Sequence, residues 1–262
     1  MLEENGHIVT DPSKDVTIVN EVFTNIGTDN VADNPTQISL DELSGYDLDD
    51  YVNIVKGIYQ DHPSICKIRN SITLEQKFNF SNITTGHTLC MLENLNTKKA
   101  TGYDGVSANA LKLSRYSIAP VITKLFNKSI QDCVFPNHFK MAIVNPIFKK
   151  SDPLAKTNYR PVSFVCVISK VFERLLDRMM TDVKQQILHQ GISAYRTNYN
   201  CQSVLMHALE IWREALENKK CVGLTLMDLS KAFDCISHPL LTAKLHDHGF
   251  SDNATKLLAS CL

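Results

Sequence analysis

The chain has 262 residues and lacks any apolar run long enough to cross a bilayer. Its first residues, Met-Leu-Glu-Glu-Asn, do not form a signal peptide. The eight cysteines are scattered, without a Cys-x-x-Cys pair or a Cys/His cluster, which argues against a zinc site and against a disulfide framework. We therefore expect an intracellular protein, nuclear or cytoplasmic, with reduced thiols, that is neither secreted nor bound to a membrane.

The bulk composition is that of a folded protein. Hydrophobic residues make up 44% of the chain and charged residues 21%, which is ordinary for a globular protein and unlike a disordered one. The length allows one large domain or two small ones with a substantial core. Composition alone does not indicate which function the core supports.

The net charge of −1 conceals a strong asymmetry along the chain. Residues 1–95 carry 5 Lys and Arg against 15 Asp and Glu, whereas residues 96–262 carry 22 against 13. A basic body behind an acidic leader indicates contact with a polyanion such as nucleic acid. Two solvated surfaces of opposite sign explain the charges equally well.

Pattern and composition divide the chain near residue 84. Residues 1–83 have short apolar pieces between polar clusters, and we interpret them as an acidic, partly disordered leader or linker with a short amphipathic helix from Val16 to Ile26. Residues 84–262 have a denser apolar pattern and are expected to form the main domain.

The main domain is predicted to be α+β and rich in helices. Two strands, at 141–148 and 160–167, are expected to form a projecting hairpin with a basic tip. A further strand is expected at 222–227. Helices are predicted near 84–95, from the cap Ser107 to Leu113, at 117–130, from the cap Ser169 to Ile187, at 202–218 with a buried apolar face that includes Trp212, at 239–246 and at 252–262.

The run from Leu224 to Asp234 is the most informative stretch of the sequence. Strand propensity stops after Met227, so Asp228 is expected at a strand end, where a rigidly held carboxylate can bind a divalent cation. Phe233, five residues later, can form a wall beside that cation. Taken alone, Asp228 is better explained as the cap of the following turn, and Phe233 as an ordinary core residue.

Several further blocks occur in a definite order, and together they resemble the reverse transcriptase of non-LTR, LINE-type retrotransposons of the jockey and CR1 kind. The resemblance is strong over residues 96–262 and weaker upstream. The blocks that carry it are Lys98 to Val106, Phe135 to Lys150, Asn158 to Ser163 with Ser169 to Glu173, Ser193 to Arg196, and Met227 to Asp234.

The resemblance implies an RNA-directed DNA polymerase that adds dNTPs to a DNA primer on an RNA template, using Mg²⁺. It implies that Asp228 is a catalytic, metal-binding acid and that Phe233 is a steric gate favouring dNTPs. By the same resemblance Arg160, Lys149 and Lys150 contact the incoming triphosphate. The two lysines are as consistent with a solvated hairpin tip. Arg196 contacts the nucleic-acid backbone or braces the fingers.

The family's other metal-binding acids lie in an aromatic-x-Asp-Asp hairpin, and this chain contains no such sequence. We therefore expect an N-terminal fragment, the fingers with an incomplete palm, that is inactive as given because two-metal catalysis needs both halves of the site. The first alternative is a non-catalytic RNA-binding protein derived from a retrotransposon. A scaffold or dimerisation module is the second.

Overall fold

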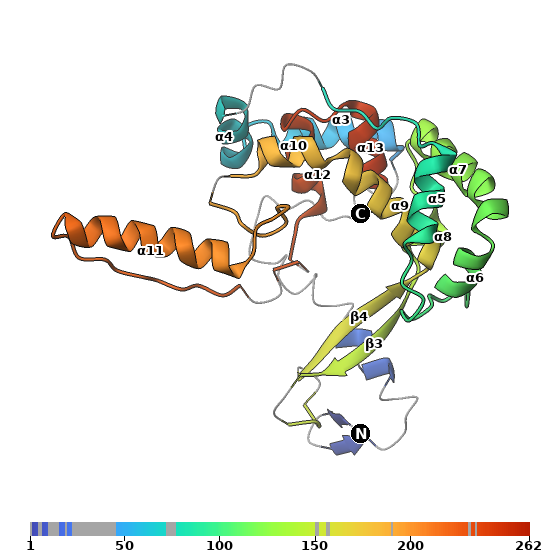
Figure 1. Ribbon diagram of the computed structural model, residues 1–262, viewed down its shortest axis with the longest axis horizontal. Helices are drawn as coiled ribbons and strands as arrows, with labels where there is room; N and C mark the ends of the chain where they lie inside the picture. Colours follow the sequence, from blue (N-terminus) through green and yellow to red (C-terminus); the bar gives the residue numbers. More distant parts are fainter. Residues whose placement is uncertain are drawn as a thin grey trace. The chain divides into compact units, whose positions relative to one another are not determined.

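A computed structural model of the chain describes residues 2–4, 7–9, 16–18, 20–22, 46–71, 77–149, 152–155, 158–189, 191–229, 232–233 and 235–262. It divides into two compact units: a larger unit, Met1–Met179 with Phe233–Leu262, and a smaller unit, Met180–Ala232. The described residues form a helix-rich α+β structure with two-stranded sheets, as expected (Figure 1).

The larger unit contains most of the secondary structure. Its strands are β1 (Leu2–Glu4), β2 (His7–Val9), β3 (Ala142–Phe148) and β4 (Tyr159–Val165). Its helices are α3 (Leu48–Tyr59), α4 (Pro63–Ser71), α5 (Thr85–Glu93), α6 (Ala108–Leu113), α7 (Arg115–Asp132), α8 (Asn137–Lys140), α9 (Val167–Met179), α12 (His238–Asp247) and α13 (Asp252–Cys261). The smaller unit holds α10 (Thr181–Ile187) and α11 (Cys201–Glu217).

Helix starts follow local capping signals. The side chains of Thr84, Ser107 and Ser251 each accept a hydrogen bond from a backbone N–H in the first turn of the helix that follows. Such a cap stabilises a helix by about 1 kcal/mol, because it satisfies a donor that has no partner within the helix. The predicted helix from Ser107 to Leu113 is confirmed.

The main core lies among α5, α7, α8 and α9. The ring of Phe172 on α9 stacks on Phe126 at 4.5 Å and on Phe135 at 5.4 Å between centroids. The buried hydroxyls of Thr88 and Thr123 hydrogen-bond to each other at 2.8 Å, which joins α5 to α7. Full burial of such aromatic side chains contributes about 1.5–3 kcal/mol each.

The predicted hairpin is confirmed. Strands β3 and β4 pair antiparallel with Ala142 opposite Val165 and Phe148 opposite Tyr159. Every residue of β3 is exposed, so neither face of this strand is covered within the part of the chain that the structure describes. The rings of Phe148 and Tyr159 lie 5.6 Å apart and stabilise the distal end of the hairpin.

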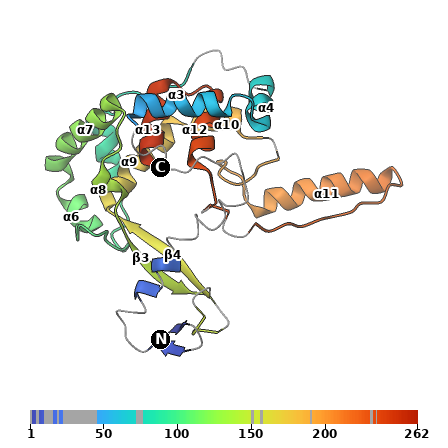
Figure 2. The same ribbon diagram turned by 180° about the vertical axis from the view of Figure 1, so that it is seen from behind.

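A second core joins the N-terminal helices to the C-terminal ones. Val55 and Tyr59 of α3, Ile65 of α4 and Ala243 of α12 form a buried apolar cluster. Both Figure 1 and Figure 2 show α3 beside α12 and α13. The domain boundary after residue 83 stays a prediction. In the larger unit, however, α3 and α4 pack directly on helices from the end of the chain.

The leader is only partly described. Residues 16–18 and 20–22 are helical, and the rest of the helix predicted from Val16 to Ile26 lies outside the described residues. The short strands β1 and β2, which pair antiparallel, were not predicted from the sequence. Among the described residues no helix has the length and apolar character needed to span a membrane.

The prediction that Ser169 caps one long helix to Ile187 is wrong in two respects. The helix begins at Val167, so that Ser169 lies inside it, fully buried. Its hydroxyl is 3.0 Å from the carbonyl oxygen of Phe139 and 2.9 Å from a carboxylate oxygen of Glu173. A separate helix, α10, follows after Met180. Ser169 therefore joins α9 to α8 instead of starting the helix.

The burial predicted for the helix at 202–218 is also wrong. Helix α11 forms, with a capping box at Asn200 and Ser203, but none of its residues is buried. Leu205 is 61% and Leu209 53% exposed, and Trp212 is half-buried. Apolar periodicity correctly predicted a helix, yet among the described residues of the smaller unit no element covers its apolar face.

Candidate functional site

Asp228 lies on an extended, exposed segment of the smaller unit. The prediction of a strand at 222–227 is wrong: residues 221–229 have no regular secondary structure. Met227 is 88% and Leu229 76% exposed. An isolated strand leaves its backbone N–H and C=O groups unpaired, and the described residues of the smaller unit contain no other strand with which these residues could pair. The Asp228 side chain is therefore exposed to solvent.

Phe233 belongs to the larger unit, at the start of its C-terminal segment. Its ring is 73% exposed, so the interpretation of Phe233 as a core residue is wrong. Ser237, four residues later, accepts a hydrogen bond from the backbone N–H of Leu240 and begins α12. The boundary between the two units falls between Ala232 and Phe233, so Asp228 belongs to the smaller unit. That Asp228 and Phe233 act in one site stays a prediction.

The hairpin brings two of the predicted cationic residues onto one face. Arg160 of β4 pairs with Ile147, and the pairing continues to the backbone N–H of Lys149, which donates to the carbonyl of Asn158 at 2.8 Å. Side chains two positions apart on a strand share a face, so Lys149 follows Ile147 on the face of Arg160. Both cations are exposed. Lys150 lies outside the described residues.

Arg196 of the smaller unit is engaged with its own loop. Its Nη2 donates to the carbonyls of Leu188 and His189, at 2.5 and 3.0 Å, and the guanidinium lies 5.6 Å from the ring centroid of Tyr199. Its Nε is buried without a hydrogen-bond partner. These contacts brace the loop between α10 and α11. The two roles expected for Arg196, contact with the nucleic-acid backbone and bracing of the fingers, stay predictions.

The described residues do not by themselves assemble a metal site. Within that part of the chain, no three His, Cys, Asp or Glu side chains converge as ligands for an ion. Mg²⁺ needs about six oxygen ligands in near-octahedral geometry, and in polymerases these come from a few carboxylates together with substrate phosphates. A single exposed carboxylate at Asp228 does not meet that requirement.

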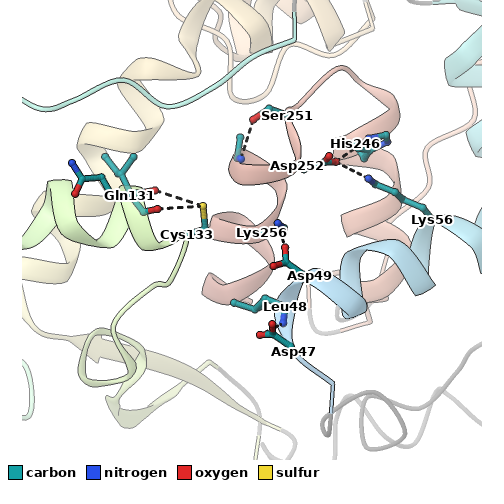
Figure 3. Close-up of polar contacts among 12 residues, drawn as sticks. Asp47, Leu48, Asp49, Lys56, Gln131, Cys133, His246, Ser251, Asp252 and Lys256 are labelled. Atoms are coloured by element: carbon teal, nitrogen blue, oxygen red, sulfur yellow. Dashed lines mark hydrogen bonds and ion pairs between the residues drawn. The ribbon is translucent and has the colours of Figure 1, made fainter.

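Sequence reasoning missed a polar cluster at the contact between α3 and the C-terminal helices (Figure 3). Asp252 of α13 accepts a hydrogen bond from Lys56 at 2.6 Å and lies 3.4 Å from Nε2 of His246. Lys256 of α13 pairs with Asp49 of α3. The spacing of acid and base within each helix was visible in the sequence, but their pairing across about 200 residues was not.

The cluster shifts the protonation of its members. Burial lowers the pKa of His246, and the nearby Lys56 and Lys77 lower it further, against the opposing charges of Asp252 and Asp247. Burial also lowers the pKa of His248, whose Nδ1 is buried without a hydrogen-bond partner. The hydrogen bond from Lys56 lowers the pKa of Asp252. Folding therefore favours neutral histidines and an ionised Asp252 here.

Residues 147–262 match the family described as reverse transcriptase (RNA-dependent DNA polymerase). The matched range begins at the end of β3 and includes Arg160, Arg196, Asp228 and Phe233.

Three curated proteins are similar to more than half of the chain. The probable RNA-directed DNA polymerase from transposon X-element of Drosophila melanogaster is 29% identical over 153 residues, which is 56% of this chain and 16% of that protein. The probable RNA-directed DNA polymerase from transposon BS of the same species is 25% identical over 59% of this chain and 17% of that protein. The RNA-directed DNA polymerase from mobile element jockey of Drosophila funebris is 27% identical over 59% of this chain and 17% of that protein. The chain spans about a sixth of the length of these relatives.

Proposed function

We propose that the chain belongs to the reverse transcriptase family and contributes the fingers and the beginning of the palm to an RNA-directed DNA polymerase of a non-LTR retrotransposon, because residues 147–262 match the family and the chain is similar to three transposon polymerases. The family match carries this proposal. The exposed hairpin of β3 and β4 supports it, since it presents cations on one face of a projecting element. The substrates would be an RNA template, a DNA primer and dNTPs.

In this proposal Asp228 is a catalytic acid that holds one divalent metal ion. The ion supplies Lewis-acid stabilisation of charge on the oxygens of the transferred nucleotidyl group when it is bound. Asp228 is exposed and therefore accessible to such an ion. Its remaining ligands would have to come from substrate phosphates and from carboxylates that the described residues do not bring near it.

The other predicted residues receive roles in substrate binding. Phe233 would exclude a ribose 2′-hydroxyl, and its exposure leaves the ring able to contact a nucleotide. Arg160, Lys149 and Lys150 would bind the triphosphate, since guanidinium and ammonium groups both pair with phosphate oxygens. Arg196 would support the nucleic-acid path indirectly, by bracing its loop through two main-chain carbonyls.

We propose further that the 262-residue chain on its own does not extend a primer, because it contains no aromatic-x-Asp-Asp sequence to complete the two-metal site. The test is primer extension on an RNA template with Mg²⁺ and dNTPs, with Asp228→Asn as the paired variant. We expect no extension from either protein. Extension by the unaltered chain that Asp228→Asn abolishes would refute the proposed inactivity and support the role of Asp228.

The second candidate function is RNA binding without catalysis, favoured by the 22 Lys and Arg against 13 Asp and Glu in residues 96–262. RNA affinity measured by fluorescence anisotropy, with and without Mg²⁺ and dNTPs, separates the two. A polymerase part predicts that a matched dNTP with Mg²⁺ stabilises the chain on a primer–template. If the chain only binds RNA, its RNA affinity should be the same with and without Mg²⁺ and dNTPs.

A further inference from the structure

Helices α3 and α4 are attached to the end of the chain by contacts that join residues far apart in the sequence. Arg69 of α4 donates to Asp247 of α12 at 2.7 Å, across 178 positions. The buried side chains of Val55, Ile65 and Ala243 form an apolar cluster between the same helices. The contact therefore combines an apolar centre with a charged edge, which is the composition of a specific interface.

Two ion pairs set the direction in which α3 packs on α13. Asp49 and Lys56 are seven positions apart on α3, and Asp252 and Lys256 are four apart on α13, so each pair shares one helix face. Asp49 pairs with Lys256, and Lys56 with Asp252 at 2.6 Å. The first turn of each helix thus meets the later part of the other, which fixes an antiparallel arrangement.

The turn between α12 and α13 is fixed by backbone hydrogen bonds to the segment at 77–80. The N–H of Phe78 donates to the carbonyl of Gly249, and the N–H of Ser251 donates to the carbonyl of Phe78, both at 2.8 Å. The rings of Phe78 and Phe250 lie 5.0 Å apart in an edge-on arrangement. These contacts hold the C-terminal helix pair at both its side and its turn.

We propose that residues 46–71 and 77–80 are an intramolecular brace that positions α12 and α13, and through the N-cap Ser237 the segment that carries Phe233. The family match does not extend to the brace. Ser237 is the N-cap of α12 and follows Phe233 by only four residues. A displacement of α12 therefore also displaces the backbone close to Phe233. The consequence for Phe233 rests on the proposed function, whereas the brace itself rests on the contacts alone.

Charge reversal on α3 tests the brace in the full chain. Asp49→Lys places a cation opposite Lys256. Asp50→Lys is the matched control, because Asp50 lies in the same first turn, is exposed and carries neither of these ion pairs. We expect Asp49→Lys to accelerate amide hydrogen exchange in α12 and α13 by roughly threefold or more relative to Asp50→Lys. The double variant Asp49→Lys/Lys256→Asp should recover most of the protection.

A core variant extends the test to the apolar centre. Ile65→Ala removes a fully buried side chain from α4, and Ile58→Ala is its control, because Ile58 on α3 is 43% exposed. We expect exchange in residues 235–249 to rise more for Ile65→Ala than for Ile58→Ala, while α5, α7 and α9 keep their protection.

Three outcomes would overturn the brace: equal exchange in Asp49→Lys and Asp50→Lys, no recovery in the double variant, or an increase for Ile65→Ala that is uniform over the larger unit. Because amide exchange requires no catalysis, these outcomes are independent of the primer-extension result. A failure of the proposed polymerase function would leave the brace standing, and the reverse also holds.

Discussion

Gly102 is the residue at which the smallest change should have a large effect. A Cβ atom built on it would lie 2.5 Å from the Cα of Cys166 and 2.7 Å from the carbonyl carbon of Val165, both backbone atoms at the junction of β4 and α9. Backbone cannot rotate away as a flexible side chain can. The glycine therefore allows the turn after Lys98 and Lys99 to rest against the base of the hairpin.

We predict that Gly102→Ala lowers the free energy of unfolding of the larger unit by about 3 kcal/mol through overpacking. Urea denaturation followed by circular dichroism measures this loss. Gly57→Ala is the control, because Gly57 lies in α3 with open space around it, and Ala there should stabilise the helix by about 0.5–1 kcal/mol. Equal midpoints for the two variants would show that the close approach at Gly102 is easily relieved.

The half-buried histidines at 246 and 248 predict a pH dependence of stability. Their pKa values in the folded chain lie below the ordinary 6.5. The unfolded chain therefore binds more protons, so stability is full above about pH 6.5 and falls as the pH drops below it toward the folded values. The lowered pKa of Asp252 acts only near and below its ordinary 3.8, outside this range.

We expect the urea midpoint of the chain to be lower at about pH 5.5 than at about pH 7.5, and His248→Gln to reduce that difference. Gln keeps a polar side chain of similar size but does not titrate. His207→Gln, on the exposed face of α11, controls for loss of a histidine. A midpoint that rises on acidification would contradict the assigned direction of the two pKa shifts.

At the scale of elements, the sequence correctly predicted helices and strands that depend on neighbouring residues. It did not predict contacts between residues that are far apart in the chain. The helix starting at Ser107 and the hairpin of β3 and β4 depend on neighbouring residues, and both were correct. The strand expected at 222–227 needs a partner from elsewhere, and it did not form. The brace was missed for the same reason, since Asp49 and Lys256 are distant in the sequence.

The candidate site residues were selected partly by local pattern and partly by resemblance. The pattern around the expected strand end selected Asp228 and Phe233, and the resemblance added Arg160; all three lie in residues 147–262, which match the family, while their roles stay predictions. The sequence did not predict where the boundary between the two units falls, because that boundary depends on long-range contacts.

The uncovered apolar face of α11 predicts self-association. Leu205, Leu209 and Leu216 are 61%, 53% and 69% exposed and recur at helical spacing on one face. Contiguous exposed apolar surface drives association in water.

We expect Leu209→Glu to lower the average mass of the chain in sedimentation velocity at high concentration. His207→Glu adds a negative charge at an exposed position of the same helix, and its average mass should be higher than that of the Leu209→Glu variant. Equal masses would assign the effect to charge alone.

At the scale of the whole molecule, acidic and basic residues are separated along the chain. The acidic first 95 residues carry a net charge of −10 and the remainder +9. Part of this charge is neutralised locally: Lys56 and Lys256 pair with acids across the contact between α3 and α13. The exposed cations of the hairpin, Arg160 and Lys149, form no ion pair with an acid in the part of the chain that the structure describes, and they remain available to a polyanion.

This difference predicts how RNA affinity depends on salt. Each cation that neutralises a phosphate of single-stranded RNA steepens the fall of log K with log salt by about 0.7. Arg160→Ala should therefore make the slope shallower by about that amount between about 50 mM and about 200 mM salt. Lys128→Ala is the control, because Lys128 already pairs with Asp132 on α7 at 2.8 Å. If both variants keep the slope of the unaltered chain, phosphate is bound elsewhere than on the hairpin. If Arg160→Ala alone reduces the slope, the hairpin binds nucleic acid whether or not the chain takes part in catalysis.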